Sequence, residues 1–254
     1  MEFVKDRFKG QNAVVTGAAQ GIGAVIAERL AKEGAHVGIL DQNCEKIDQT
    51  IQQIKGQGGS ASGLVCDITS PEEIASKFRD FVKSQGSLEI VIHSAGIVGP
   101  TGVNMEAVSS EAFEQVCRVN LTGSFNVLKY ALPHLKANNY GRVLMIASIA
   151  GKEGNAGMTC YSASKAGVIG LVKAAAKEYA KTPISINALA PATVMTPMVE
   201  AMPKHQVDYM KDKIPKGRLG KLEEVAAMSC FIVSRECSFS TGFTYDLSGG
   251  RAVY

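Results

Sequence analysis

Short apolar runs alternate with longer amphipathic stretches along this chain. The apolar runs predict seven strands, at 12–16, 36–41, 62–66, 89–93, 141–147, 185–190 and 243–247. The amphipathic stretches predict helices at 21–33, 43–56, 71–84, 111–137, 161–181 and 222–234. The third helix has clear start signals, because Ser70, Pro71 and Glu73 occupy the N-cap, first-turn and capping-box positions. The alternation predicts a doubly wound α/β fold, with a parallel sheet covered by helices on both faces.

No internal boundary interrupts this pattern. The 254 residues contain no linker-like stretch and no repeat, so we expect a single domain over residues 1–254. The segment 192–220 departs from the alternation, because it holds prolines at 197, 203 and 215 and a run rich in lysine and glycine. Two interpretations stay open for it. It is a surface excursion with a little helix, or it is a lid, since ligands collect at the carboxyl ends of parallel strands.

Composition and charge narrow the function classes. The net charge is only +3, with acids and bases interspersed, so neither nucleic acid nor a membrane surface is expected as a partner. The apolar runs are too short to span a membrane, and the first residues lack the apolar core of a signal peptide. The six cysteines form no CxxC pair, and no histidine has metal-ligand spacing, so we expect neither disulfides nor a metal. We therefore expect a cytoplasmic protein that acts on a small molecule.

The first predicted strand runs into a glycine-rich turn. Residues 16–23 read Thr-Gly-Ala-Ala-Gln-Gly-Ile-Gly, which places Gly17, Gly21 and Gly23 between that strand and the first helix. Glycines at such a turn let the backbone approach a pyrophosphate, whose charge is stabilised by the helix N-terminus. The same spacing fits an ordinary tight turn, but its place between a strand and a helix favours a dinucleotide.

A second group of chemically active residues lies in the middle of the chain. Tyr161 and Lys165 are four positions apart on a predicted helix, so their side chains share a face. A neighbouring ammonium lowers the pKa of a phenol, and such a tyrosine exchanges protons near neutral pH. Ser148 lies thirteen positions before Tyr161, and Asn120 lies earlier still. This arrangement predicts general acid–base chemistry.

Together these residues resemble the short-chain dehydrogenase/reductase family, and the resemblance covers essentially the whole chain. It implies a Rossmann-type domain with a catalytic tetrad of Asn120, Ser148, Tyr161 and Lys165. By this resemblance, Tyr161 exchanges a proton with the substrate oxygen and Ser148 stabilises the charge that develops there. Lys165 lowers the pKa of Tyr161 and holds the nicotinamide ribose, while Asn120 bends its helix and anchors a water. The implied reaction is hydride transfer between a nicotinamide cofactor and a secondary alcohol or ketone.

The resemblance also implies a cofactor site, and two motifs depart from the family pattern. Residues 93–96 read His-Ser-Ala-Gly where Asn-Asn-Ala-Gly is usual, and Ala192 replaces the glycine that usually follows the proline at 191. We expect His93 to be a packed, hydrogen-bonded residue with no catalytic role. The residues expected against the cofactor are Gly17, Gln20, Gly21, Ile22, Gly23, Asp41, Asp67, Ile68, Ala95, Gly96, Tyr161, Lys165, Pro191, Thr193, Val194 and Thr196.

Asp41 distinguishes between the two common nicotinamide cofactors. It ends the second predicted strand, where a carboxylate accepts hydrogen bonds from the ribose hydroxyls of NAD and repels the 2′-phosphate of NADP. Residues 38–43 contain no lysine or arginine, so we predict NAD(H) as the cofactor. The alternative is that Asp41 merely caps the following helix. Asp67 follows the third predicted strand, and the resemblance implies that it contacts the adenine. The alternative is that it has no ligand, because aspartate is common between a strand and a helix.

The loop between Ser148 and Tyr161 is expected to border the substrate. Lys152, Glu153 and Asn155 are polar enough to bind hydroxyls or a carboxylate, together with Ser148 and Tyr161. A surface loop would be polar in any case, so both interpretations remain.

The leading functional prediction is an NAD-dependent dehydrogenase that acts on a secondary hydroxyl of a polyol, sugar or sugar acid. A 3-oxoacyl thioester reductase that works with an acyl carrier protein is the alternative, because the segment 150–154 and the Tyr-Ser-Ala-Ser-Lys motif also resemble those enzymes. Methionines at 195, 198, 202 and 210 suggest an apolar alcohol as a third substrate class. A catalytically silent dinucleotide sensor belongs to a different class and would need only the glycine turn and Asp41. The resemblance further implies a homotetramer.

Overall fold

The fold is built on one sheet of seven parallel strands. The structure, a computed structural model, describes residues 3–252 and Tyr254, without the side chains of Pro197 and Met198. The strand order is β3-β2-β1-β4-β5-β6-β7, and every pairing is parallel. The strands are β1 (Asn12–Thr16), β2 (His36–Asp41), β3 (Ser60–Val65), β4 (Ile90–His93), β5 (Gly141–Ile146), β6 (Ile184–Pro191) and β7 (Thr244–Leu247). All seven predicted strands are confirmed, with ends shifted by at most two residues.

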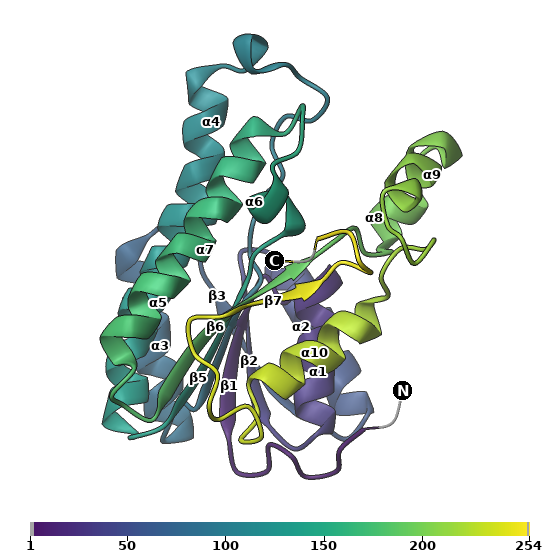
Figure 1. The fold of residues 1–254 in the computed structure, drawn as a ribbon. Coiled ribbons are helices and arrows are strands. Elements are labelled where there is room, and N and C mark those ends of the chain that lie inside the picture. The colour runs from purple at the N-terminus through teal and green to yellow at the C-terminus, as the bar shows by residue number, and fades with distance from the viewer. Residues whose placement is uncertain (1–2, 253) are drawn as a thin grey trace.

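Helices cover both faces of this sheet, which confirms the predicted doubly wound, Rossmann-type architecture (Figure 1). One face packs against α1 (Gly21–Lys32), α2 (Cys44–Gly56) and α10 (Leu222–Ile232) in one apolar core. The other face packs against α3 (Pro71–Gln85), α5 (Gly123–Ala137) and α7 (Thr159–Tyr179) in a second core. The interior strands are buried on both sides, which is why they read as continuous apolar runs and not as alternating ones.

The predicted helix at 111–137 is not one regular helix. It begins as α4 (Ser110–Cys117), passes through a π-helical turn, η2 (Arg118–Thr122), and continues as α5. A π turn is confined to a single turn of the helix, which is too short for hydrophobic periodicity to distinguish from a regular α-helix. Four short helical segments were also not predicted as separate elements: η1 (Met105–Ala107), α6 (Ile149–Glu153), α8 (Pro197–Glu200) and α9 (Lys204–Asp212).

The two ends of the segment 192–220 are hydrogen-bonded to each other, and the residues between them project from the body of the protein. Val194 and Gly220 form a parallel bridge, in which Met195 N donates to Gly220 O at 2.8 Å and Gly220 N donates to Thr193 O at 3.1 Å. Between these ends, α8 and α9 stand away from the sheet and the other helices (Figure 1). No residue of α9 is buried. The methionine at position 198, one of the four expected to favour an apolar substrate, lies outside the described side chains.

Candidate active site

Two adjoining cavities lie at the carboxyl ends of the strands, where parallel sheets collect ligands. The larger has a volume of about 770 Å³ and the smaller about 150 Å³, and both are lined by Ile22, Ser94, Gly96 and Ile97. Because they share these walls, we treat them as one cleft. The larger part faces the glycine turn and the ends of β2 and β3, and the smaller part contains Ser148, Tyr161 and Lys165.

The glycine turn has the shape and polarity that a pyrophosphate requires. Gly17 has a φ of +65°, and a Cβ there would lie 2.6 Å from the backbone nitrogen of Ala95, so only glycine fits. Gln20, the N-cap of α1, makes no side-chain hydrogen bond to the helix, and the first turn holds no acidic residue. The positive end of α1 therefore faces the cleft without a side-chain acceptor, which suits an anionic ligand.

Asp41 ties the end of β2 to this turn. Its Oδ2 accepts a hydrogen bond from Ala19 N at 3.3 Å, and its Oδ1 accepts one from Asn43 N at 3.1 Å. The N-cap of α2 is Asn43, whose Oδ1 accepts from Lys46 N at 3.0 Å. The alternative that Asp41 caps this helix is therefore wrong. Its carboxylate lines the larger part of the cleft.

Two basic residues at the cleft escaped the sequence analysis. Lys46 Nζ donates a hydrogen bond to Gln20 Oε1 at the rim. Lys46 lies one helical turn beyond residues 38–43, and this spacing is the signal in the sequence that marks it. Arg118 lines the larger part of the cleft from the π turn. No sequence signal marks it, because its orientation depends on that turn.

Tyr161 and Lys165 lie together on α7, as the spacing predicted, but their electrostatics differ from the expectation. Lys165 is 5% exposed and donates from Nζ to Ile146 O at 2.8 Å. Burial lowers the pKa of Lys165 to about 8. Burial also raises the pKa of Tyr161, against the opposing effect of the Ser148 hydroxyl. The expected lowering of the Tyr161 pKa by Lys165 is wrong for this structure, because desolvation dominates and the ammonium bonds to a backbone carbonyl.

Ser148 follows β5 and begins α6 as its N-cap. Its Oγ accepts a hydrogen bond from Ala150 N at 3.1 Å, which fixes the side chain at the mouth of the smaller cavity. As an acceptor in this bond, the hydroxyl keeps its own proton for Tyr161 or for a substrate oxygen.

Asn120 acts through backbone contacts beneath the cleft. It is fully buried in the π turn, accepts from Ile97 N at 2.8 Å and donates to Ile97 O at 2.8 Å. Its Nδ2 also donates to Ser164 Oγ at 3.0 Å. A Cβ on Gly96 would lie 3.0 Å from Asn120 Oδ1 and 3.5 Å from Lys165 Nζ, so the glycine lets both side chains approach the loop. Asn120 thus joins the loop after β4 to the helix that carries Tyr161.

His93 has the structural character that the sequence analysis expected. It is 1% exposed, and its Nδ1 shares a hydrogen bond of 2.7 Å with Thr16 Oγ1. Burial lowers the pKa of His93 to about 3, so the ring stays neutral. The pair links β4 to β1 below the cleft.

The polar side chains that follow Ser148 form ion pairs and hydrogen bonds with the C-terminal segment. Lys152 Nζ lies 3.2 Å from Asp246 Oδ2, and Arg251 contacts both Glu153 Oε2 at 2.8 Å and Asn155 Oδ1 at 2.7 Å. None of the three lines the cleft. Sequence proximity to Ser148 placed them at the substrate, but α6 and the turn after it direct their side chains toward β7 and the C-terminal segment.

Most of the predicted cofactor residues surround the cleft. Those that line it are Gly17, Gln20, Gly21, Ile22, Gly23, Asp41, Asp67, Ile68, Ala95, Gly96, Tyr161, Lys165, Pro191 and Thr196. Thr193 and Val194 do not line it; Val194 is 6% exposed and packs into the core beside its bridge to Gly220. Among the described residues, no three His, Cys, Asp or Glu side chains gather as metal ligands would. No helix within that part of the chain is long and apolar enough to cross a membrane.

A cleft that runs from a glycine turn to a tyrosine and a buried lysine on one helix is typical of an oxidoreductase with a nicotinamide cofactor. Comparison with known proteins gives the family. A family model described as enoyl-(acyl carrier protein) reductase matches residues 17–251. The chain belongs to the short-chain dehydrogenase/reductase family.

Two curated relatives match along nearly their whole length. A 2-dehydro-3-deoxy-L-rhamnonate dehydrogenase (NAD(+)) from Sphingomonas sp. (strain SKA58) is 41% identical, over 100% of both chains. A 3-oxoacyl-[acyl-carrier-protein] reductase from Thermotoga maritima is 35% identical and covers 97% of this chain and 100% of its own.

Two solved structures have the same fold as this chain. NAD⁺-bound xylitol dehydrogenase has a TM-score of 0.90 and 29% identity over 96% of this chain and 99% of that one. A 3-oxoacyl-[acyl-carrier protein] reductase from Brucella melitensis has a TM-score of 0.92 and 30% identity over 98% and 94% of the two chains.

Proposed function

We propose that this protein is an NAD-dependent dehydrogenase that oxidises a secondary hydroxyl group of a sugar acid or polyol. The observation that carries the proposal is the single cleft in which Asp41 and the glycine turn occupy one part and Ser148, Tyr161 and Lys165 the other. The substrate class follows from similarity to the Sphingomonas sugar-acid dehydrogenase and to xylitol dehydrogenase.

Within this proposal, the side chains of the smaller cavity handle the proton. Bound NAD⁺ supplies the acceptor for the hydride that leaves the carbinol carbon. Tyr161, as phenolate, accepts the proton of the substrate hydroxyl, while Ser148 donates a hydrogen bond to the same oxygen. Because burial raises the pKa of Tyr161, the phenolate forms more readily as pH rises, and Lys165, whose Nζ lies 5.8 Å from the centre of the ring, serves to hold the nicotinamide ribose. Asn120 holds the Ile97 loop and α7 in register.

Cofactor choice rests on Asp41 in this proposal. Its carboxylate stands at the end of β2 with both oxygens held by backbone N–H groups, where the adenosine ribose of NAD would lie. A 2′-phosphate would meet this negative charge at close range. Lys46 stands nearby, but one of its N–H donors is already bonded to Gln20 Oε1 and is not free for a 2′-phosphate.

A 3-oxoacyl thioester reductase is the second candidate. The description of the matching family model and the 35% identical relative from Thermotoga maritima favour it. Its thioester substrate would have to enter past the segment 192–220, which we propose acts as a lid hinged at the Val194–Gly220 bridge.

Assembly and location extend the proposal. Phe113 on α4 and Phe125 on α5 are 39% and 47% exposed, and Phe243 beside the edge strand β7 is 56% exposed. Aromatic side chains are enriched at protein interfaces, so these exposed residues support a homotetramer joined through the α4–α5 face and the β7 edge. Light scattering at micromolar concentration tests this, since a monomer mass would contradict it. We place the protein in the cytoplasm.

The experiment that tests the function follows absorbance at 340 nm with both cofactors. NAD⁺ is offered with a panel of polyols, sugars and sugar acids, and NADPH with a 3-oxoacyl thioester. NAD-linked oxidation of a sugar-derived alcohol supports the leading proposal, and NADPH-linked thioester reduction supports the second. Intact NAD⁺ binding without turnover on either panel would instead indicate a dinucleotide sensor.

A further inference from the structure

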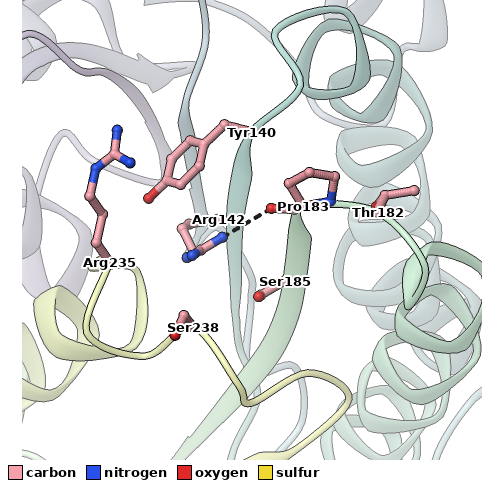
Figure 2. A pocket seen from close by; sticks show the side chains of 7 residues that line it. All are labelled: Tyr140, Arg142, Thr182, Pro183, Ser185, Arg235 and Ser238. Carbon is pink, nitrogen blue, oxygen red and sulfur yellow. Dashed lines mark hydrogen bonds between the residues drawn. The ribbon is translucent and has the colours of Figure 1, made fainter.

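A separate cavity of about 380 Å³ lies at the opposite, amino end of the sheet. It is bounded by the start of β5, the start of β6 and the loop after α10 (Figure 2). β5 is six residues long, which separates this cavity from Ser148 by roughly 20 Å. None of its lining residues belongs to the catalytic cleft.

Arg142 forms the fixed part of this cavity. Arg142 is 6% exposed, and its guanidinium donates a hydrogen bond from Nε to Ser234 O at 3.2 Å. Nη1 donates to Gly141 O at 3.0 Å and to Pro183 O at 3.1 Å, the second of which Figure 2 shows. These three bonds hold the guanidinium in place. Both N–H groups of Nη2 remain without an acceptor among the described residues.

Arg235 and Tyr140 complete the charged part of the lining. The guanidinium carbons of Arg142 and Arg235 lie 4.6 Å and 4.7 Å from the centre of the Tyr140 ring, and Figure 2 shows both side chains beside it. The Tyr140 hydroxyl is buried and has no hydrogen-bond partner within the described part of the chain. Burial raises the pKa of Tyr140, so the hydroxyl keeps its proton and remains a donor.

The cavity is electrostatically unbalanced. Of the carboxylates in the described ranges, none lies within ion-pair distance of Arg142 or Arg235. The negative charge of Glu89 contributes to the raised pKa of Tyr140. Its carboxylate oxygens, however, accept hydrogen bonds from Asn12 N at 2.7 Å and from Asn138 Nδ2 at 2.7 Å. A buried cation without an anionic partner is costly. The buried Arg142 guanidinium and the unpartnered Tyr140 hydroxyl, with the exposed Arg235 guanidinium beside the same ring, therefore favour an anion here.

We propose that this cavity binds a phosphate group, either free or at the end of a small organic phosphate. Arg142 Nη2, Arg235 and the Tyr140 hydroxyl supply donors on one side. The hydroxyls of Ser185 and Ser238 line the cavity and make no hydrogen bond with the described residues, so they supply two more. These donors exceed what the two oxygens of a carboxylate need, whereas the three terminal oxygens of a phosphate match them.

Thermal unfolding tests the proposal, because a ligand that binds only the folded state raises Tm. The wild type is titrated with sodium phosphate, against sodium chloride at equal ionic strength. Arg235→Gln removes one exposed guanidinium and should weaken phosphate binding about tenfold or more. Lys181→Gln removes an equal charge from an exposed position outside the cavity and should bind phosphate as the wild type does.

The comparison of variants also excludes phosphate bound at the glycine turn. Arg235→Gln leaves that turn untouched, so phosphate held there would raise Tm equally in both proteins. Glycerol 3-phosphate separates the two sources of the group: tighter binding than inorganic phosphate identifies an organic phosphate, and equal or weaker binding identifies the free ion. No phosphate-specific rise in Tm, or an undiminished rise in both Arg235→Gln and Ser185→Ala, would overturn the proposal.

Discussion

Strand β5 has a buried cation at each end, and the two cations differ in kind. At its carboxyl end Lys165 bonds to the Ile146 carbonyl, and at its amino end Arg142 bonds to the Gly141 and Pro183 carbonyls. An ammonium loses its proton when burial lowers its pKa, and that of Lys165 falls to about 8. A guanidinium keeps its charge at any physiological pH.

The difference separates chemistry from binding. The carboxyl end joins Lys165 to a tyrosine and a serine, groups that exchange and orient protons, while the amino end offers fixed positive charge and hydroxyl donors. The same strand thus holds a titratable centre suited to catalysis and a static centre suited to an anion.

The largest expected effect is a loss of kcat on substitution of Tyr161, at the carboxyl end of β5. Tyr161→Phe removes the only hydroxyl that we assign to proton exchange and should lower kcat by about 10²- to 10⁴-fold, with NAD⁺ affinity retained. Initial rates and a fluorescence titration of NAD⁺ measure the two quantities. Lys181→Gln at the amino end serves as control and should keep wild-type kcat. A fully active Tyr161→Phe variant would refute the mechanism.

The second prediction concerns the pH dependence of stability. The folded-state pKa of Lys165 is about 8, below its ordinary 10.5, so the folded protein binds fewer protons between these values. The destabilisation by Lys165 is therefore complete below pH 8 and is relieved as pH rises toward 10.5. Relative to Lys165→Met, the wild type should gain on the order of 2 kcal/mol in the free energy of unfolding between pH 7.5 and 9.5. Urea unfolding at both pH values measures the free energy of unfolding. An equal change with pH in the wild type and in Lys165→Met would contradict the prediction.

The third prediction concerns cofactor choice in the larger part of the cleft. Wild-type kcat/KM should favour NAD⁺ over NADP⁺, and Asp41→Ser should shift the ratio toward NADP⁺ by about tenfold. Lys46→Gln is the matched control, because it removes the nearby base and should shift the ratio the other way. A wild type that prefers NADP⁺ would show that Lys46 and Arg118 outweigh Asp41.

The smallest effect is expected at the C-terminal segment. Arg251→Gln breaks the contacts with Glu153 and Asn155, which hold the loop between Ser148 and Tyr161. We expect KM for the substrate to rise by a few-fold with kcat nearly unchanged, because Arg251 positions this loop and bonds to none of the catalytic side chains within the described residues. Steady-state kinetics separate the two parameters, and a large loss of kcat would place Arg251 in the catalytic machinery.

Hydrophobic periodicity predicted the sheet well because its central strands are buried on both faces. The start of α3 was also predicted, since Ser70 caps it and Pro71 occupies the first turn. Even there one detail differs: Glu73 accepts from Asp67 N at 2.9 Å and not from the backbone of Ser70. Local signals fix where an element begins, while the partner of a flexible carboxylate depends on the loop around it.

The candidate site was predictable where the chemistry demands a local motif. The glycine turn, Asp41 and the Tyr161–Lys165 pair each combine a residue type with an element boundary. Three features depend instead on tertiary contacts and gave no local signal: the π turn around Asn120, the bond from Lys165 to Ile146, and the contacts of Arg251. Contacts between segments about a hundred positions apart, such as Glu153 with Arg251, cannot be read from either segment alone.

Isotope transfer tests the central claim most directly. The alcohol that the substrate panel identifies is prepared with deuterium on its carbinol carbon and oxidised with NAD⁺, and the mass of the reduced cofactor is measured. Direct hydride transfer at the Tyr161 site predicts one deuterium in each NADH. NADH without deuterium would contradict the account, because the hydrogen would then have passed through solvent.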